Sequence, residues 1–392
     1  MMALPEELVE EILLRLPPEE PPAHLVRAAM VCKAWRRILS GAGFRRRYCR
    51  FHRATPPTLL GYVCGVSTGP GPQFVPTTSY FSPPPLATRC GYRAMDCRHG
   101  RVLIRDTSEE SPGFVVYDLI TGNRQHLSLP AATHQRTDMC SFVGAVLCAR
   151  HHHHQRGGCD HHLECHGGPF LVVSVGTDDD AGAAAGAEHR AMRTCASVYS
   201  SETGAWSPQT HCGNQNYYGV GCCHEPSLLI GDTLYFILAC DDVIKILKYD
   251  LCGHGLSVID APQVFNNKAV LIDVDGGLGI VQFDHDYCSI YTWSRHVDAY
   301  GVGEWVRHNN NVVRLETLIP TIHDNVQCPD HMSIHFAEGT STVLLCFNFL
   351  GVFTLDLNSR QLREVNFNKT CDNDMLPYVN FYIPGIPLVP FL

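Results

Sequence analysis

The segment LPEELVEEILLRLPPEE, residues 4–20, places apolar side chains at helical spacing near the amino terminus. An apolar residue at every third or fourth position predicts a short amphipathic helix with one apolar face. The residues of this face are Leu8, Val9, Ile12, Leu13 and Leu16. Pro5 suits the first helical turn, where its missing N–H costs nothing, and Pro17 with Pro18 ends the helix.

The next segment, HLVRAAMVCKAWRRILSGAGF at residues 24–44, carries a second apolar set. Its members are Leu25, Val26, Ala29, Met30, Val31, Cys32, Trp35, Ile38 and Leu39. Gly41 and Gly43 are expected to end the helical stretch, which gives about three short helices. A module of this size is too small to bury all of its apolar surface.

This N-terminal pattern resembles the F-box over about residues 3–50. The resemblance is carried by LPEELVEEIL (residues 4–13) together with VCKAWRRIL (residues 31–39) and Phe44. One departure is the run PPEEPPAHL between the two halves, whose prolines stiffen the connection. In that family the helices dock on a Skp-type adaptor, which joins them to cullin and RING subunits in an SCF-type ubiquitin ligase.

Carried over by this resemblance, ten residues are expected to bind the adaptor: Leu4, Pro5, Leu8, Ile12, Leu13, Leu16, Val31, Cys32, Trp35 and Leu39. Trp35 is the expected anchor, because a large aromatic on a module with little core favours an interface. The alternative is a small amphipathic cap that packs on whatever follows it.

Composition describes a turn-rich globular chain. Of 392 residues, 18% are charged and 45% are hydrophobic, and 33 glycines and 25 prolines indicate many turns. Residues 1–53 hold ten Lys/Arg and six Asp/Glu, a net charge of +4; since the total is −9, the remainder carries −13. Binding to nucleic acid has little support from so acidic a main body.

The 19 cysteines do not by themselves indicate secretion. Several lie within apolar strand-like runs, such as Cys240, Cys288 and Cys346, where we expect small, buried and reduced side chains. We expect no secretory signal and no membrane span, because the N-terminus is acidic and no apolar run is long enough. The predicted location is the cytoplasm, the nucleus or both.

After residue 91 the pattern becomes strand-like and repeats. One unit is FVVYDLITGNRQHLSL (residues 114–129), and similar units include ILKYDLCGHGLSVI (residues 246–259) and GVFTLDLNSRQLREV (residues 351–365). Each unit pairs an apolar strand with a turn and a more polar strand, and two further strand candidates precede it. Four strands that recur roughly every 40–50 residues indicate a β-propeller.

Five complete units are predicted at 92–130, 140–210, 226–262, 267–313 and 332–366. The segments LLGYVCGV (residues 59–66) and YVNFYIPGIPLVPF (residues 378–391) could pair to form a sixth blade and close the ring. Six blades are favoured; a seventh would need a weak unit near 66–90 or in 313–332. The region resembles the propeller-like F-box-associated domain that follows the F-box in large plant families, on DCRHGRVLI (residues 96–104) and the VYDLITG-type turns.

The predicted organisation is therefore a small all-α F-box domain followed by a large all-β propeller, α+β as a whole. We place the F-box at 3–50, a Pro/Gly-rich connection with a first partial blade at 51–91, and the propeller at 92–392. An insertion at 151–190 is rich first in His and Cys and then in Gly and Ala.

Metal and catalytic sites are not predicted. Cys159, His161, His162, Cys165 and His166 could ligate zinc, but the chain has no C-x-x-C and a variable loop is favoured. GVSTG (residues 65–69) fits G-x-S-x-G, yet PGPQFVP follows and cannot begin the required helix, so Ser67 is not expected to be a nucleophile. Asp273, Asp275, Asp284 and Asp286 are expected to satisfy turns.

The sequence thus predicts a non-enzymatic substrate adaptor of an SCF-type ligase, with no cofactor and an unknown target protein. Two other functions stay open: a propeller that senses a small ligand or glycan, and a Skp-bound scaffold that recruits no cullin.

Overall fold

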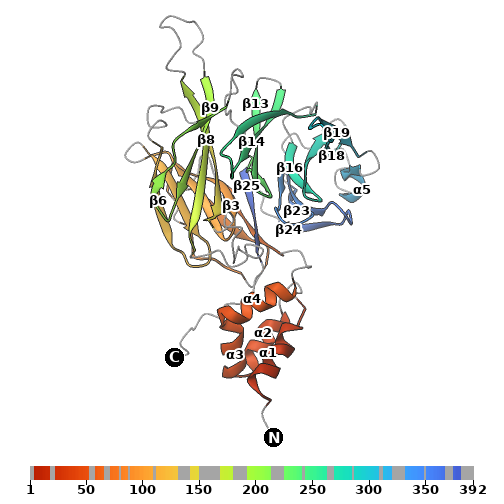
Figure 1. Ribbon diagram of the computed structural model, residues 1–392. Helices are drawn as coiled ribbons and strands as arrows, with labels where there is room; N and C mark the ends of the chain where they lie inside the picture. The colour runs from red at the N-terminus through yellow and green to blue at the C-terminus, as the bar shows by residue number, and fades with distance from the viewer. Residues whose placement is uncertain are drawn as a thin grey trace, which may run out of the picture.

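The computed structural model describes residues 4–17, 23–52, 58–65, 71–78, 81–86, 89–108, 112–130, 142–149, 168–179, 192–212, 225–240, 243–262, 269–284, 287–308, 312–319, 332–347, 350–366 and 374–380. Figure 1 shows a group of helices at the N-terminal end beneath a ring of sheets. The predicted fold class, an all-α module followed by a six-bladed propeller, is confirmed.

The helical module has four described helices rather than about three. They are α1 (Glu6–Leu14), α2 (Ala23–Val31), α3 (Lys33–Ser40) and α4 (Ala42–Phe51). Gly41 separates α3 from α4, but Gly43 lies inside α4, so the expectation that it ends the helical stretch is wrong. The fourth helix forms because Phe44 and Tyr48, four residues apart, both bury their rings in the module core.

Six sheets are found in the part of the chain that the structure describes. The first is β3 (Tyr92–Arg98), β4 (Arg101–Asp106), β5 (Gly113–Asp118) and β6 (Arg124–Ser128). The second is β7 (Phe142–Cys148), β8 (Phe170–Asp179), β9 (Met192–Ser200) and β10 (Ala205–Trp206), with β11 (Thr210–His211) also on β9. The third is β12 (Leu228–Ile230), β13 (Thr233–Cys240), β14 (Val243–Asp250) and β15 (Leu256–Asp260).

The fourth sheet is β16 (Ala269–Val274), β17 (Gly277–Asp284), β18 (Ser289–Val297) and β19 (Gly303–Arg307), with β20 (Val313–Arg314) also on β18. The fifth is β21 (Met332–Phe336), β22 (Thr342–Phe347), β23 (Gly351–Asp356) and β24 (Leu362–Asn366). A short helix, α5 (Leu315–Leu318), follows β20. Each sheet is an antiparallel meander in chain order, as a propeller blade requires.

The closing sheet joins the two ends of the ring, as predicted. Its order is β2 (Gln73–Pro76), β1 (Thr58–Gly65) and β25 (Asp374–Asn380). The C-terminal strand begins before the predicted residue 378, and the predicted part after 380 lies outside the described residues. Pro377 fits within β25 because that strand pairs on one side only, so a missing N–H breaks no second ladder.

The segment predicted as a plain surface connection supplies β2, which is a correction. Phe74 of β2 and Phe81 after it pack their rings against Tyr378 of β25. Gly61 of β1 lets this strand approach closely, because a Cβ there would collide with the Phe74 ring and the Val75 carbonyl. The described parts of 66–90 and 313–332 join the closing and fourth sheets, so no seventh blade arises from them.

A repeated aspartate explains the turns after the third strand of the blades. Asp118, Asp250 and Asp356 end β5, β14 and β23, and each accepts a hydrogen bond on Oδ1 from a backbone N–H of the following turn. Asp298, one residue after β18, accepts two such bonds. One residue in each of these turns has positive φ: Gly122, His254, Gly301 and Arg360. The YDL and LDL motifs of the sequence are thus turn caps.

Candidate functional site

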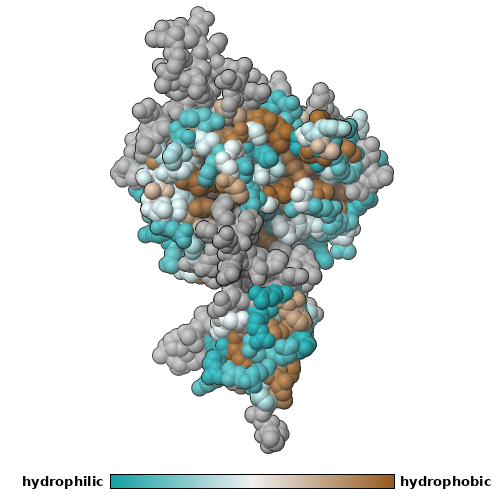
Figure 2. Space-filling model, in the orientation of Figure 1, coloured by the Kyte–Doolittle hydropathy of each residue, from teal (hydrophilic) through white to brown (hydrophobic). Residues whose placement is uncertain are grey.

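Helix α1 divides its apolar residues between the module core and the surface. Val9, Leu13 and Leu14 are buried. Leu4, Leu8 and Ile12, spaced four residues apart, are 58%, 52% and 49% exposed. Side chains at this spacing lie along one stripe of a helix. An apolar stripe therefore remains on the surface of the module, where Figure 2 shows hydrophobic side chains among hydrophilic ones.

A second exposed apolar group lies where α2 meets α3. Met30 and Val31, at the end of α2, are 72% and 62% exposed, and Cys32, the N-cap of α3, is also exposed. We call these three residues together with Leu4, Leu8 and Ile12 the exposed apolar face. Leaving several large apolar side chains in water on so small a module indicates a surface that binds another protein.

Two of the ten predicted binding residues do not lie on this face, which is a correction. Leu13 and Leu39 are each 1% exposed and belong to the core that α1, α2, α3 and α4 share. They support the face by holding the helices together, and they are not available for contact. The remaining predicted residues of the first half, Pro5 and Leu16, are exposed and half-buried, respectively.

Trp35 is half-buried and packs against the module core. Its neighbours there are helical residues, and it has no place in the clusters formed by the propeller strands. The alternative, a cap whose tryptophan is hidden against the sheets, is therefore wrong. Part of the Trp35 ring lies at the surface, where a second protein could cover it.

The fourth helix ties the module together. The Tyr48 hydroxyl donates to the Leu16 carbonyl at 2.8 Å, and His52 Nε2 lies 2.8 Å from the Leu14 carbonyl oxygen. Both contacts hold the end of α1 against α4. Surface ion pairs add Glu6 to Arg37 at 2.8 Å and Glu10 to Arg47 at 2.9 Å. Exposed pairs of this kind contribute little stability, but they help to orient α1.

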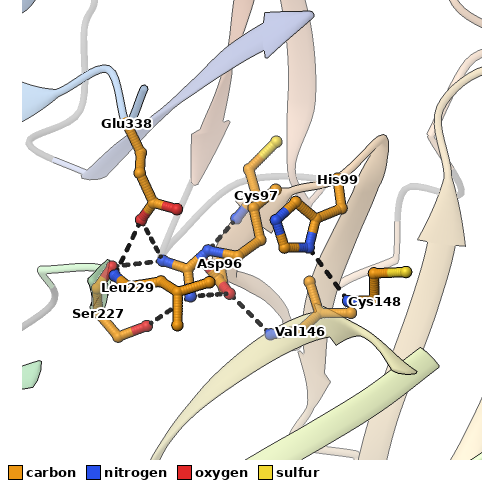
Figure 3. A network of polar contacts seen from close by, with 9 residues as sticks. Asp96, Cys97, His99, Val146, Cys148, Ser227, Leu229 and Glu338 are labelled. Carbon is orange, nitrogen blue, oxygen red and sulfur yellow. Dashed lines mark hydrogen bonds and ion pairs between the residues drawn. The ribbon is translucent and has the colours of Figure 1, made fainter. Parts of the chain in front are cut away.

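The propeller holds a buried polar network at its inner strands (Figure 3). Arg98, at the end of β3, donates from Nη1 to Ser227 Oγ at 3.0 Å and from Nη2 to the Ser227 carbonyl at 2.5 Å. The same Nη2 also donates to Glu338 Oε2 at 2.9 Å. Because Ser227 precedes β12 and Glu338 follows β21, one guanidinium links three blades.

Asp96 extends this network to a fourth blade. Its Oδ2 accepts the Val146 N–H of β7 at 2.7 Å and lies 3.5 Å from Arg98 Nη1. The neighbouring His99 Nδ1 accepts the Cys148 N–H at 3.1 Å. A cavity of about 30 Å³ lies between these strands, with Asp96, Arg98 and Glu338 in its lining. This volume suits a water molecule rather than a substrate.

Burial raises the pKa of the Asp96 carboxyl from 3.8 to about 6, although Arg98 and the Val146 N–H favour its ionised form. All the polar partners of Asp96 and Arg98 that the structure describes are structural groups of other blades. The network therefore holds the ring together.

We expect the stability of the propeller to fall as pH rises from about 4 to 6, and Asp96→Asn to remove this component. Between these values the folded protein retains a proton on Asp96 that the unfolded chain releases, so the stability gained from the raised pKa is lost as pH increases. The full difference is about 3 kcal/mol. Denaturant titrations of both proteins at several pH values measure it, and identical slopes in the two would contradict the assignment.

The aspartates after the strands of the fourth blade confirm the predicted turn role. Asp273 Oδ1 accepts the Gly276 N–H at 2.6 Å, and Asp284 Oδ1 accepts the Tyr287 N–H at 3.3 Å. Asp286, Ser67 and the His/Cys candidates at 159–166 lie outside the described residues. Within the described ranges no three metal-ligating side chains come together, and none of the helices there is long and apolar enough to cross a membrane.

The cysteines behave as predicted with one exception. Cys64, Cys148, Cys195 and Cys346 are buried free thiols. Cys288 is buried but disulfide-bonded, so the expectation of a reduced side chain is wrong there. The Cys240 side chain lies outside the described residues.

Comparison with protein families matches residues 1–47 to the F-box domain. Comparison with curated proteins finds no match. Among solved structures, TolB from Acinetobacter baumannii has 12% identity and a TM-score of 0.41, covering 86% of this chain and 72% of that one. A DUF4784 family protein from Bacteroides caccae has 8% identity and a TM-score of 0.42, with 82% and 74% covered. A chain of a nidogen/laminin complex has 10% identity and a TM-score of 0.37, with 78% and 91% covered.

These TM-scores are below 0.5, so the propeller assignment rests on the six sheets of this chain itself. The chain carries an F-box domain at its N-terminal end, followed by a six-bladed propeller. F-box domains typically bind adaptors of the Skp type, and the proteins that carry them are generally non-catalytic.

Proposed function

We propose that this chain is the substrate-recognition subunit of an SCF-type ubiquitin ligase. The observation that carries the proposal is the exposed apolar face, which lies within the residues that match the F-box domain. The helices that present it have a complete core of their own, so the face is preformed for a partner. We propose a Skp-type adaptor as that partner, with cullin and RING subunits joined through it.

The propeller would then hold the target protein. Support comes from the turn between β18 and β19, where Val297, Tyr300 and Val302 are 56%, 93% and 66% exposed. The two backbone hydrogen bonds to Asp298 fix this turn, so its side chains are presented without a large ordering cost on binding. A rigid, projecting tyrosine favours contact with a concave surface of another protein.

The chain would contribute proximity rather than chemistry. Holding a target beside the ubiquitin donor raises the local concentration of its lysines, while bond formation takes place on the ligase partners. The proposed location is the cytoplasm, the nucleus or both.

The test is reconstitution of the purified chain with a Skp-type adaptor, a cullin and a RING subunit. We expect a stable complex in size-exclusion chromatography and transfer of ubiquitin to the chain itself when the charged E2 is supplied. A chain that binds the adaptor but excludes cullin would be a scaffold. A chain that binds no adaptor at micromolar concentration would refute the proposal.

A further inference from the structure

A cleft separates the first two blades, and no part of the proposed function has yet used it. Its volume is about 360 Å³, within the range of small-ligand sites. One wall comes from the start of β4, the end of β5 and the start of β6. The other comes from residues 168–170 and Ser201, at the ends of β8 and β9. The blades are packed together beneath it, because Leu127 of β6 shares a cluster with Phe170 and Val172 of β8.

Two guanidinium groups line the cleft. Arg101 is 3% exposed, and its Nη2 donates to the Gly168 carbonyl at 2.6 Å. Its guanidinium carbon lies 5.4 Å from the centre of the Phe170 ring. Contacts with the opposite wall therefore hold this cation in place. Arg124 is exposed at the start of β6 and brings a second, accessible cation to the same space.

Neutral donors lie beside these cations. Ser201 Oγ accepts the Phe170 N–H at 2.8 Å, so its own hydroxyl hydrogen can still be donated. Asn123 contributes a carboxamide to the lining. Gln125 is held by a hydrogen bond from its Nε2 to the Tyr199 hydroxyl at 3.2 Å, which braces the cleft from the second blade.

Negative charge in the lining is limited to Asp118. Its Oδ1 accepts the N–H groups of Ile120 and Thr121 at 3.0 and 2.8 Å, so the carboxylate is committed to the turn. Two guanidiniums against one carboxylate leave the lining with a net charge of +1. The chain beyond residue 53 has a net charge of −13, so this local excess of donors and positive charge is unlike its surroundings.

We propose that this cleft binds an oxyanion, a carboxylate or phosphate group, on the surface of the target protein. Planar guanidiniums match such groups with two parallel hydrogen bonds, and partial burial strengthens the attraction. The inference rests on the proposed function for the identity of the occupant, but the binding chemistry is a property of the cleft. It assigns target recognition a charged contact that is separate from the apolar turn at β18–β19.

The experiment measures binding of three probes to the full chain by calorimetry at constant ionic strength. The probes are inorganic phosphate, N-acetyl-O-phosphoserine amide and N-acetylglutamate amide, which distinguish the phosphate from the carboxylate source. We expect saturable binding of at least one probe, about tenfold or more weaker in Arg124→Ala and partly restored in Arg124→Lys. Arg363→Ala, which removes an exposed arginine of β24, is the matched control and is expected to bind as the unmodified chain does.

Two results would overturn the inference: no saturable binding of any probe, or equal affinities for Arg124→Ala and the unmodified chain. Arg124 is exposed, so its substitution is expected to leave the fold intact, which the melting temperature verifies. Adaptor binding is measured on the same samples. A chain that binds the adaptor but no oxyanion would refute the cleft alone, whereas an oxyanion bound without any adaptor binding would refute the proposed function alone.

Discussion

Ile12→Asp is expected to abolish adaptor binding while the chain stays folded. Ile12 lies in the middle of the exposed apolar stripe of α1, with half of its surface in water. An interface would cover it, and an aspartate there would lose the apolar contact and bury a charge without a partner. We expect a loss of about 3 kcal/mol or more, at least a hundredfold in Kd, measured by calorimetry with a Skp-type adaptor.

Two variants make this result specific. Val302→Asp places the same charge at an exposed valine of the propeller and is expected to leave adaptor affinity unchanged. Leu13→Ala, next to Ile12 but buried, is expected to destabilise the module by about 2–5 kcal/mol, so its binding defect follows unfolding. If Ile12→Asp kept its affinity within twofold in a folded module, the exposed apolar face would not be the docking surface.

Arg98→Met is expected to destabilise the propeller by about 3–5 kcal/mol at neutral pH. The substitution leaves Asp96 and Glu338 without the guanidinium that links their blades, and uncompensated buried charge is costly. The loss should be smaller at pH 5, because the pKa of Asp96 is already about 6 and rises further when the cation is removed.

Denaturant unfolding followed by tryptophan fluorescence measures this loss. Four tryptophans are present, and a Trp35→Phe background leaves only the propeller residues Trp206, Trp293 and Trp305 as reporters. Arg363→Met, an exposed arginine on β24, is the matched control and should change stability by less than about 0.5 kcal/mol. A loss below about 1 kcal/mol for Arg98→Met at pH 8 would show that the network does not hold the ring.

Part of the site could be recognised from local sequence, and part could not. The pattern of α1 showed which residues are apolar, but not that Ile12 faces water while Leu13 fills the core. Both lie within the width of one apolar face, and the contacts of α4 select between them. The helix α4 was itself missed, because two glycines and four arginines obscured the buried pair Phe44 and Tyr48.

The Arg98 network had a signal that was not used. Asp96 and Arg98 stand two positions apart in a strand with buried alternate residues, so both charges point to one side of the sheet. Charged residues on the buried face of an inner strand require partners. Local spacing could not name those partners, since Ser227 and Glu338 lie 129 and 240 residues away from Arg98 in the chain.

The sequence alone determined the order of elements: N-terminal helices, five four-stranded units with capped turns, and strands at both ends that close a sixth. These features depend on periodicity and turn chemistry within a few residues. Only the tertiary structure decided which apolar side chains stay exposed, which charges meet at the inner strands, and that two arginines share a cleft. Each of these depends on the packing of blades from distant parts of the chain, which residue spacing within one segment does not encode.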